Sequence, residues 1–383
     1  MVEGLAQPQV LYVGRFRLPD RNAAAQRVLA NAKGLREAGF DVVLAEIGDI
    51  NSRGGPIERL SDYEGFVCYR LPMKESGRLD HPQLAIRQVV ELIEVLPSVR
   101  AVIAYNYPAI PLARLHRVCR NRGIRCAADV TEWYGSGHLS SGVSKVLKRL
   151  DTGLRMRVIQ RRLDALVVIS KYLEDYYRGG TRADIIRLPP LVDVQDSKWA
   201  RGKSAPNRAE MTLVWAGSFN AEKERLDLTV DAVREAAERV ALRLDVVGMS
   251  SQEFADRYPD VSLPEAGVVT FHGRVAHQEA LDRVARADYS IIVRDQSRVT
   301  DAGFPTKFVE SITLGTPVLA TEHPDLSDIL ADGRNGSIVP LDDVVSGLIA
   351  VHGRTLPTDR ELFDYRNYGE EFDRLARVLE GRQ

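Results

Sequence analysis

The chain has 383 residues, which is too many for one ordinary hydrophobic core and suits two domains of usual size. Hydrophobic residues make up 44% and charged residues 27%, so the composition is that of a globular protein and excludes general disorder. The formal net charge of −1 provides no overall attraction to nucleic acid, and we expect no nucleic-acid partner.

The three cysteines, Cys68, Cys119 and Cys126, are too few and too irregularly spaced for a disulfide framework or a tetrahedral zinc site. Residues 1–9 lack a basic start and an apolar stretch, and no apolar run is long enough to span a bilayer. The sequence therefore predicts a cytoplasmic protein, with peripheral contact at the inner face of the membrane as the alternative.

In the first half, apolar strands alternate with helical patterns, which is typical of a parallel sheet covered by helices. Residues 10–13 predict a strand, residues 23–38 a helix that stops at Gly39, and residues 42–45 the next strand, which together form a βαβ unit. Further strands are predicted at 66–70, 101–105, 125–129, 165–169 and 185–187, and a helix at 82–96. We assign residues 1–195 to a doubly wound, Rossmann-like domain.

A polar run with proline and glycine at 194–210 is typical of a linker, and the alternation then restarts. Strands are predicted at 213–216, 242–247, 268–271, 289–293 and 318–321, and helices at 226–238, 277–285 and 306–314. Residues 206–355 thus predict a second doubly wound α/β domain. The tail, residues 356–383, contains an aromatic-rich amphipathic stretch that predicts a helix packed on the N-terminal domain.

Residues 301–321 are the most informative for function, because they predict a loop, a helix, a turn and a buried strand. Gly303 allows the backbone to approach a ligand closely, and Thr306 is predicted to cap the helix. A diphosphate at this helix start would be stabilised by free N–H groups and the helix dipole, and Lys307 would add a full charge. The carboxylate of Glu310, one turn further, suits the paired hydroxyls of a ribose.

This segment resembles the family 4 retaining glycosyltransferases of the GT-B fold, the group 1 glycosyltransferases. Their signature is a Gly-Phe loop, matched here by Gly303-Phe304, then a helix with a glutamate, then Gly-x-Pro-Val. Other matches, in the family's order, are residues 165–170, 188–193, 215–218 with 222–223, 271–275, 287–289 and 332–336. The resemblance covers nearly the whole chain, and the separate segments occur in the same order as in the family.

The resemblance implies two Rossmann-like α/β domains that face each other across a cleft, with a C-terminal helix that crosses back. Gly217, Ser218 and Lys223 would hold the donor diphosphate, and Gly273 and Arg274 would lie near the nucleotide base. The implied reaction is retaining transfer of a hexosyl-type sugar from a UDP- or GDP-linked donor to an acceptor hydroxyl, with no metal and no cofactor. A glycan, a lipid-linked molecule or a small molecule would be the acceptor.

The chain departs from the family pattern at two positions on the donor side. The family's first glutamate is replaced by Ala302, and we expect the neighbouring Asp301 to contact the transferred sugar in its place. An arginine of the family is replaced by Ser218, so Lys223, Lys307 and Arg298 would neutralise the diphosphate.

On the acceptor side, Glu132 occupies the place where the family often has a histidine. Its carboxylate would orient or deprotonate the acceptor hydroxyl, although a solvated loop residue is an equal alternative. His138 is a second candidate for this role, against an ordinary surface histidine. In the first loop, Arg15 and Asn22 would supply hydrogen-bond donors to the acceptor, against simple exposure.

Residues 144–164 hold seven Lys or Arg against two Asp, and Leu147, Leu150, Leu154 and Val158 fall on one helical face. A basic amphipathic helix of this kind can lie on an anionic membrane. The favoured alternative is that the apolar stripe packs on its own sheet, because Gly153 weakens a continuous surface helix.

Three rival functions remain for this fold. A nucleotide-sugar epimerase would convert the donor without an acceptor, and a catalytically silent scaffold would keep the nucleotide site, as the loss of the first glutamate at Ala302 allows. A nucleotide-binding oxidoreductase is disfavoured, because residues 10–22 lack a Gly-x-Gly-x-x-Gly turn after the strand.

Overall fold

The structure is a computed structural model that describes residues 7–19, 21–48, 56–72, 86–96, 98–133, 142–201, 210–217, 223–262, 267–331 and 333–382. The chain divides into two compact units. The first consists of Met1–Val192 and Tyr365–Gln383, and the second of Asp193–Asp364. No helix among the described residues is both long and apolar enough to cross a membrane.

The first unit is built on an eight-stranded sheet in the order β3-β4-β2-β1-β5-β6-β7-β8. Its strands are β1 (Gln9–Gly14), β2 (Asp41–Ile47), β3 (Glu58–Arg59), β4 (Val67–Leu71), β5 (Val99–Tyr105), β6 (Arg125–Val130), β7 (Ala165–Val168) and β8 (Asp184–Arg187). All pairings are parallel except the short β3–β4 pair. The strand order reverses at β1, so the switch point between β1 and β5 is where ligands bind in such sheets.

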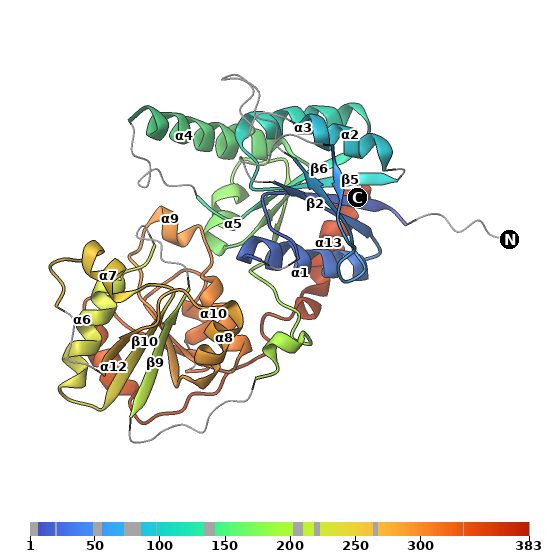
Figure 1. The fold of residues 1–383 in the computed structure, drawn as a ribbon. Helices are drawn as coiled ribbons and strands as arrows, with labels where there is room; N and C mark the ends of the chain where they lie inside the picture. Colours follow the sequence, from blue (N-terminus) through green and yellow to red (C-terminus); the bar gives the residue numbers. More distant parts are fainter. Residues whose placement is uncertain are drawn as a thin grey trace. The chain divides into compact units, whose positions relative to one another are not determined.

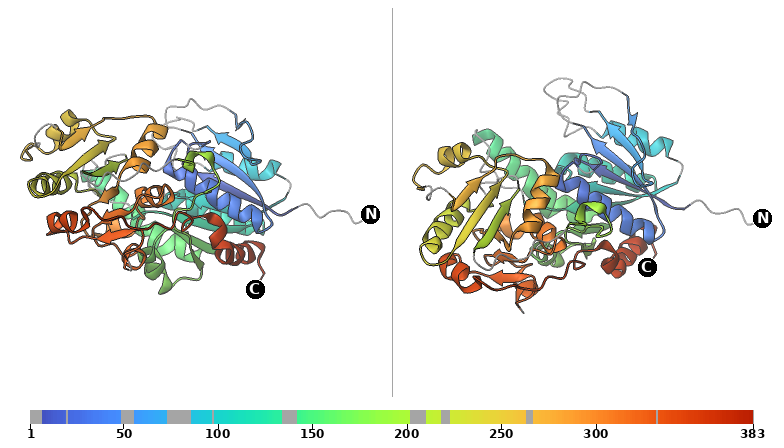
Figure 2. Two further views of the ribbon diagram at one scale, coloured as in Figure 1. Left: turned by 90° about the horizontal axis from the view of Figure 1, so that it is seen from below. Right: turned by 60° about the horizontal axis from the view of Figure 1, so that its bottom comes forward.

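Helices cover this sheet in the pattern of a doubly wound domain, as Figure 1 shows. They are α1 (Ala23–Glu37), α2 (Arg87–Val95), α3 (Ala109–Asn121), α4 (Gly142–Leu154), α5 (Lys171–Arg178) and α13 (Gly369–Glu380), and η1 (Arg155–Ile159), η2 (Gln160–Arg162) and η4 (Tyr365–Tyr368) add shorter turns. The C-terminal α13 lies beside α1 in both views of Figure 2. Phe372 of α13 lies directly over Gly34 of α1, where a larger residue would overlap its ring.

A buried polar network joins β1, α1 and β6 in this unit. Asp129 accepts from the Arg27 guanidinium at 2.8 and 3.0 Å, and the hydroxyl of Tyr12 donates to the same carboxylate. Arg27 also donates to the carbonyl oxygens of Leu188 and Pro189, at 2.8 and 3.0 Å. All three side chains of the network are nearly inaccessible, so removal of one partner would leave a buried charge uncompensated. The two carbonyl contacts of Arg27 also hold the segment that leaves β8.

The second unit has a six-stranded sheet, all parallel, in the order β11-β10-β9-β12-β13-β14. Its strands are β9 (Met211–Ala216), β10 (Leu242–Val247), β11 (Val269–Phe271), β12 (Tyr289–Ile292), β13 (Val318–Ala320) and β14 (Gly336–Ile338). The order again reverses at the first strand, which places the switch point between β9 and β12.

The helices of the second unit are α6 (Leu226–Ala237), α7 (Ser251–Arg257), α8 (His277–Arg286), α9 (Arg298–Asp301), α10 (Thr306–Thr313), α11 (Ser327–Leu330) and α12 (Val344–Val351), and η3 (Ser197–Trp199) is a short turn. The core is formed by the apolar faces of β9, β10 and β12 against α6 and α12. In the predicted tail, the aromatic stretch is divided between the units. Phe363 packs against Phe304 and Phe308 of the second unit, whereas Tyr365 and Phe372 belong to the core of the first.

The structure contradicts the favoured interpretation of residues 144–164. The α-helix runs through Gly153 and ends at Leu154, where a π-helical turn, η1, follows. Leu147, Leu150 and Leu154 do not pack on the sheet, since their exposed fractions are 62, 64 and 43%. Lys148 and Asp151 are half-buried instead, and Thr152 is buried.

Candidate functional site

Two glycines line the carboxyl ends of β9 and β10. Gly217 has φ +141° and Gly248 has φ +109°, both in the region that favours glycine. A Cβ on Gly248 would overlap the carbonyl oxygen of Gly217, and a Cβ on Gly217 would lie 2.5 Å from Cε of Lys307. The sheet therefore ends in bare backbone next to the Lys307 side chain.

Lys307 belongs to a buried charged cluster at the switch point of the second sheet. Its Nζ lies 3.3 Å from Oε2 of Glu224 and 3.5 Å from the centre of the Trp215 ring. Glu224 also accepts from Nε of Arg294 at 3.0 Å and from Nε1 of Trp215 at 3.3 Å. One carboxylate, 3% exposed, is thus shared by two cations that are 12 and 11% exposed, so the cluster is net positive.

Burial and charge act in opposite directions on this cluster. Burial lowers the pKa of Lys307 to about 8, although Glu224 opposes the shift, and Arg294 adds to it. Burial acts to raise the pKa of Glu224, but the charges of Lys307 and Arg294 outweigh it and the pKa is lowered. An anion that approached Lys307 would favour its charged form, and would find a second cation nearby in Arg294.

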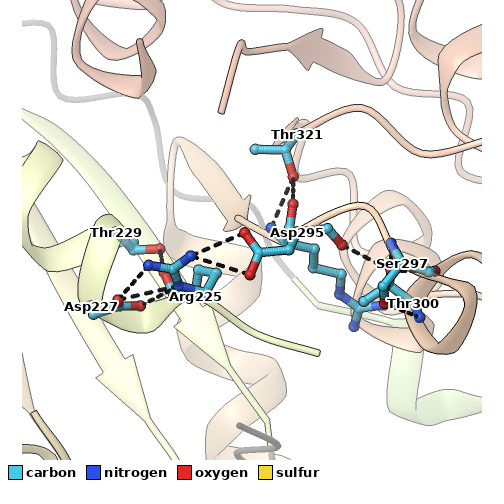
Figure 3. A network of polar contacts seen from close by, with 8 residues as sticks. Arg225, Asp227, Thr229, Asp295, Ser297, Thr300 and Thr321 are labelled. Atoms are coloured by element: carbon cyan, nitrogen blue, oxygen red, sulfur yellow. Dashed lines mark hydrogen bonds and ion pairs between the residues drawn. The ribbon is translucent and has the colours of Figure 1, made fainter. Parts of the chain in front are cut away.

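A polar network fixes the loop that carries Arg294 away from β12 (Figure 3). Arg225 donates to Asp227 and, at 3.0 Å, to Asp295. The Oγ1 of Thr321 accepts from the Arg294 N–H at 2.8 Å and donates to its carbonyl oxygen at 2.9 Å. Ser297 and Thr300 then form a reciprocal capping box at the start of α9. The loop is therefore held at both ends before Asp301.

The helix α10 begins at Thr306, as the sequence predicts, but Thr306 is not its cap. The N-cap is Pro305, which has no side chain able to accept a hydrogen bond, and Thr306 is already the first helical residue. The Phe308 N–H donates to the carbonyl oxygen of Pro305 at 2.9 Å. The start of α10 still carries the positive end of the helix dipole, with Lys307 one residue inside it.

The Gly303-Phe304 loop before α10 has a packing role. Phe304 is 7% exposed, and its ring contacts Phe308, Phe363 and His323 edge-on. Its side chain therefore anchors the loop, in which Gly303 and Pro305 are buried as well. Contact of Gly303 with a ligand stays a prediction.

Asp301 and Ala302 have opposite environments. Ala302 is fully buried, so a carboxylate in its place would be desolvated. Asp301 is the last residue of α9 and half-buried, and burial raises the pKa of its carboxyl. Arg298 is the first residue of α9. Contact of Asp301 or Arg298 with a donor stays a prediction.

The remaining donor-side predictions fall on both exposed and partly covered residues. Glu310, 26% exposed, lies 3.6 Å from Nε2 of His277 on α8. Gly273 follows β11 with φ +64°, and Arg274 is 85% exposed beside Glu253. Lys223 is the first described residue of the segment that leads into α6, and Ser218 lies outside the described residues.

On the acceptor side, electrostatics connect Glu132 with α4. Burial lowers the pKa of Lys148, and Arg155 and Arg15 act in the same direction, whereas Asp151 and Glu132 oppose them. Glu132 follows β6, where Thr131 and Asn106 exchange hydrogen bonds at 2.6 and 3.2 Å. Glu132 and Arg15 thus lie close enough to Lys148 of α4 for their charges to act on it.

Asn22 has a structural task that the sequence analysis did not assign. Its Oδ1 accepts from the N–H of Ala25 at 2.9 Å and of Arg17 at 3.3 Å, so it caps α1 and closes the first loop. Its contact with an acceptor remains a prediction. His138 lies outside the described residues.

Within the described part of the chain, no group of three or more His, Cys, Asp or Glu side chains could hold a metal ion.

Comparison with known proteins adds to this geometry. Residues 210–354 match the family model described as "Glycosyl transferases group 1". No curated protein sequence matches the chain. Sucrose-phosphate synthase from Thermosynechococcus elongatus has a similar structure, with a TM-score of 0.68 and 15% identity over 98% of this chain and 100% of that one. The chain has the GT-B fold.

Two further GT-B structures are similar over almost their full length. The lipopolysaccharide outer core galactosyltransferase WaaB gives a TM-score of 0.64 at 12% identity, over 97% of this chain and 99% of that one. HepE from Anabaena, solved in complex with UDP and glucose, gives 0.63 at 12% identity, over 98% and 100%. With the family match to the second unit, these findings support a group 1 glycosyltransferase.

Sequence reasoning missed Glu224, Arg294 and Gly248. Glu224 directly follows the predicted Lys223, and Arg294 directly follows the last strand residue expected before the signature loop. Arg294 and Gly248 lie at the carboxyl ends of β12 and β10, and a charged residue or a glycine at such a strand end is the signal that could have identified them.

Proposed function

We propose that this protein transfers a hexosyl-type sugar from a nucleotide-diphosphate sugar to an acceptor hydroxyl, with retention of anomeric configuration and without a metal. The observation that carries the proposal is the net positive Glu224–Lys307–Arg294 cluster. It lies at the β9/β12 switch point, within the residues that match the group 1 family model.

The proposed roles follow from charge and position. Lys307 and Arg294 would stabilise the leaving diphosphate together with Lys223, and Glu310 would accept from the ribose hydroxyls. Because such a reaction depends on positioning and on stabilising the leaving group, it needs no nucleophile triad. Asp301 would contact the transferred sugar, while Glu132 would orient the acceptor. UDP and GDP are both compatible as the nucleotide of the donor.

The test is incubation with a panel of UDP- and GDP-linked sugars, followed by calorimetry and product analysis, with and without EDTA. Tight binding of one donor, slow hydrolysis and transfer to an added sugar acceptor are expected, unchanged by EDTA. NMR of the product would show the anomeric configuration of the donor. Lys223→Ala should weaken donor binding, and an unchanged dissociation constant contradicts a diphosphate contact at Lys223.

The same experiment separates the rival functions. An epimerase would convert the nucleotide sugar without any acceptor, and a silent scaffold would bind it without turnover. Binding of none of the donors would reject the proposal as a whole.

A further inference from the structure

The outer face of α4 is apolar and lies at the surface of the first unit. Val146, Leu147, Leu150 and Leu154 have exposed fractions of 54, 62, 64 and 43%, and their spacing places them on one side of the helix. Ile110 of the neighbouring α3 is 46% exposed. Single exposed leucines are ordinary, but a row of them along one helix marks an interaction surface.

The helix is held with this face outward. On its inner side, Asp151 accepts from the Ala109 N–H at 2.8 Å, at the start of α3. Thr152, Arg155 and Met156 are buried behind it. α4 contacts α3, and Figure 1 shows the two helices next to each other. The apolar face is therefore a fixed feature of the fold, and not a frayed helix end.

An arginine-rich cleft of about 1220 Å³ adjoins the far end of this helix, on the same unit. Arg157, in the π-helical turn that continues α4, lines it together with Arg117 and Arg120 of α3. Arg125, Arg161, Arg162 and Arg182 also line it, together with Asp164, which pairs with Arg125 at 2.6 Å. Arg117, Arg120, Arg157, Arg162 and Arg182 are exposed, and none of these five forms an ion pair in the described part of the chain.

The cleft lies away from the edge where Glu132 is placed. Arg125 opens β6 and Arg182 precedes β8, so the cleft follows the amino ends of these strands, whereas Glu132 follows the carboxyl end of β6. The arginines of the cleft are therefore not part of the candidate acceptor site.

We propose that α4 and this cleft dock the first unit on an anionic membrane surface. The leucines would enter the boundary between headgroups and acyl chains, and the arginines would attract the lipid phosphates. Nucleic acid would satisfy the arginines but would leave four exposed apolar side chains in contact with a phosphate backbone. A lipid surface has both an apolar and an anionic layer, and it matches both halves of this surface.

Docking also bears on the acceptor, in a step that rests on the proposed function. The inner side of α4 carries Lys148, which interacts with Glu132 and Arg15. Glu132 and Arg15 are thus within electrostatic reach of the docked helix, which suits an acceptor hydroxyl carried by a lipid.

The experiment is co-sedimentation of the full chain with vesicles. One set contains phosphatidylcholine alone and the other equal parts of phosphatidylcholine and phosphatidylglycerol, both at low salt. Binding to the anionic set only, weakened by added salt, is expected. No sedimentation with anionic vesicles, or equal sedimentation with both sets, overturns the proposal.

Variants distinguish the two halves of the surface. Leu147→Ser with Leu150→Ser should weaken binding roughly tenfold or more, because two leucine side chains that would be buried in the membrane are lost. Arg117→Gln with Arg157→Gln should weaken it about fivefold for each charge. Leu341→Ser and Arg286→Gln, exposed positions on the second unit, are the matched controls and should leave vesicle binding unchanged.

Two further outcomes would contradict the proposal. One is equal loss in the control variants. The other is binding of a single-stranded oligonucleotide that the leucine variant keeps and the arginine variant loses, without vesicle binding. Donor binding by the second unit should be the same in all variants, so failure of membrane docking and failure of the glycosyltransferase proposal are distinguishable.

Discussion

Both sheets reverse their strand order beside their first strand, but the two units use buried charge in different ways. In the first, Asp129 is fully buried and its partners Arg27 and Tyr12 are equally covered, so every bond of the network is to the protein itself. In the second, Glu224 is as deeply buried, but Lys307 and Arg294 retain partial exposure.

The balance of positive and negative charge also differs between the two networks. One arginine meets one carboxylate in the first unit, and its remaining N–H groups are used by the carbonyl oxygens of Leu188 and Pro189. In the second unit two cations share one carboxylate, which leaves one positive charge without compensation in the cluster. A closed, neutral network indicates a structural role, and a net positive one at a switch point indicates an anion site.

Removal of the carboxylate from the closed network gives the largest effect. Asp129→Asn leaves the charge of Arg27 buried, and we expect a loss of about 3–5 kcal/mol in the free energy of unfolding. Urea unfolding followed by circular dichroism measures it. Arg178→Ala, which breaks exposed ion pairs on α5 of the same unit, is the control and should cost less than about 1 kcal/mol. Similar losses of unfolding free energy in both variants would mean that the buried Asp129 network contributes no more than an exposed ion pair.

Lys307→Met tests the second cluster, because methionine preserves the packing on Trp215 and removes only the charge. We expect the dissociation constant of the nucleotide-sugar donor to rise about 10- to 100-fold, from loss of one charge-assisted contact. The control is Lys198→Met, since Lys198 also lies over an indole ring, at 5.1 Å from Trp199, and pairs with Asp196 at 3.6 Å.

The pH dependence of donor binding sharpens the same test. The pKa of Lys307 is about 8 in the free protein, so its charge is present below that value and is lost as the pH rises through it. Donor affinity should therefore fall between pH 7 and pH 9 in the wild type, and more weakly in Lys307→Met. If calorimetry shows the same pH dependence of donor affinity in the wild type and in Lys307→Met, Lys307 does not contact the diphosphate.

His323 makes the second unit sensitive to acid. Burial lowers its pKa to about 4, and its ring accepts from the Asp325 N–H at 3.2 Å while Nε2 lies 3.2 Å from the Thr300 carbonyl oxygen. The unfolded chain, with an ordinary pKa of about 6.5, binds a proton that the folded unit excludes, so stability falls as the pH falls below that value. From pH 7 to pH 5 the loss should be about 2 kcal/mol.

Thermal unfolding at the two pH values measures this loss. His323→Gln should flatten the dependence, and His352→Gln, at a histidine that bonds the Ala241 carbonyl oxygen, should leave it as in the wild type. An unchanged slope in His323→Gln would assign the acid sensitivity to another group.

Much of the fold was predictable because buried strands leave a local signal. The apolar run at 242–247 predicts β10 with the bounds that the structure shows, and β6 and β8 differ by one residue from their predictions. The helix α12, Val344–Val351, gave no periodic signal because nearly all its residues are apolar. Its burial depends on the neighbouring α6, which no local pattern reports.

The candidate site was predictable only where one residue carries the chemistry. Lys307 and the start of α10 follow from a local motif, but the partner of Lys307 does not. Glu224 and Arg294 are 70 positions apart and meet only because β9 and β12 are neighbours in the sheet. Likewise, the period of α4 predicts an apolar face, but the sequence does not say that this face points outward.

Asn22→Ala gives the smallest effect and tests whether the first loop belongs to the closed, structural part of its unit. Loss of the cap of α1 should cost about 1 kcal/mol, measured by urea unfolding, while Asn22→Ser, which still caps the helix, should cost only a few tenths. If Asn22 also contacts the acceptor, KM for the acceptor should rise in both variants, including the one that keeps the cap. A rise confined to Asn22→Ala would assign Asn22 to the fold alone, because serine restores the helix cap and does not restore an amide donor.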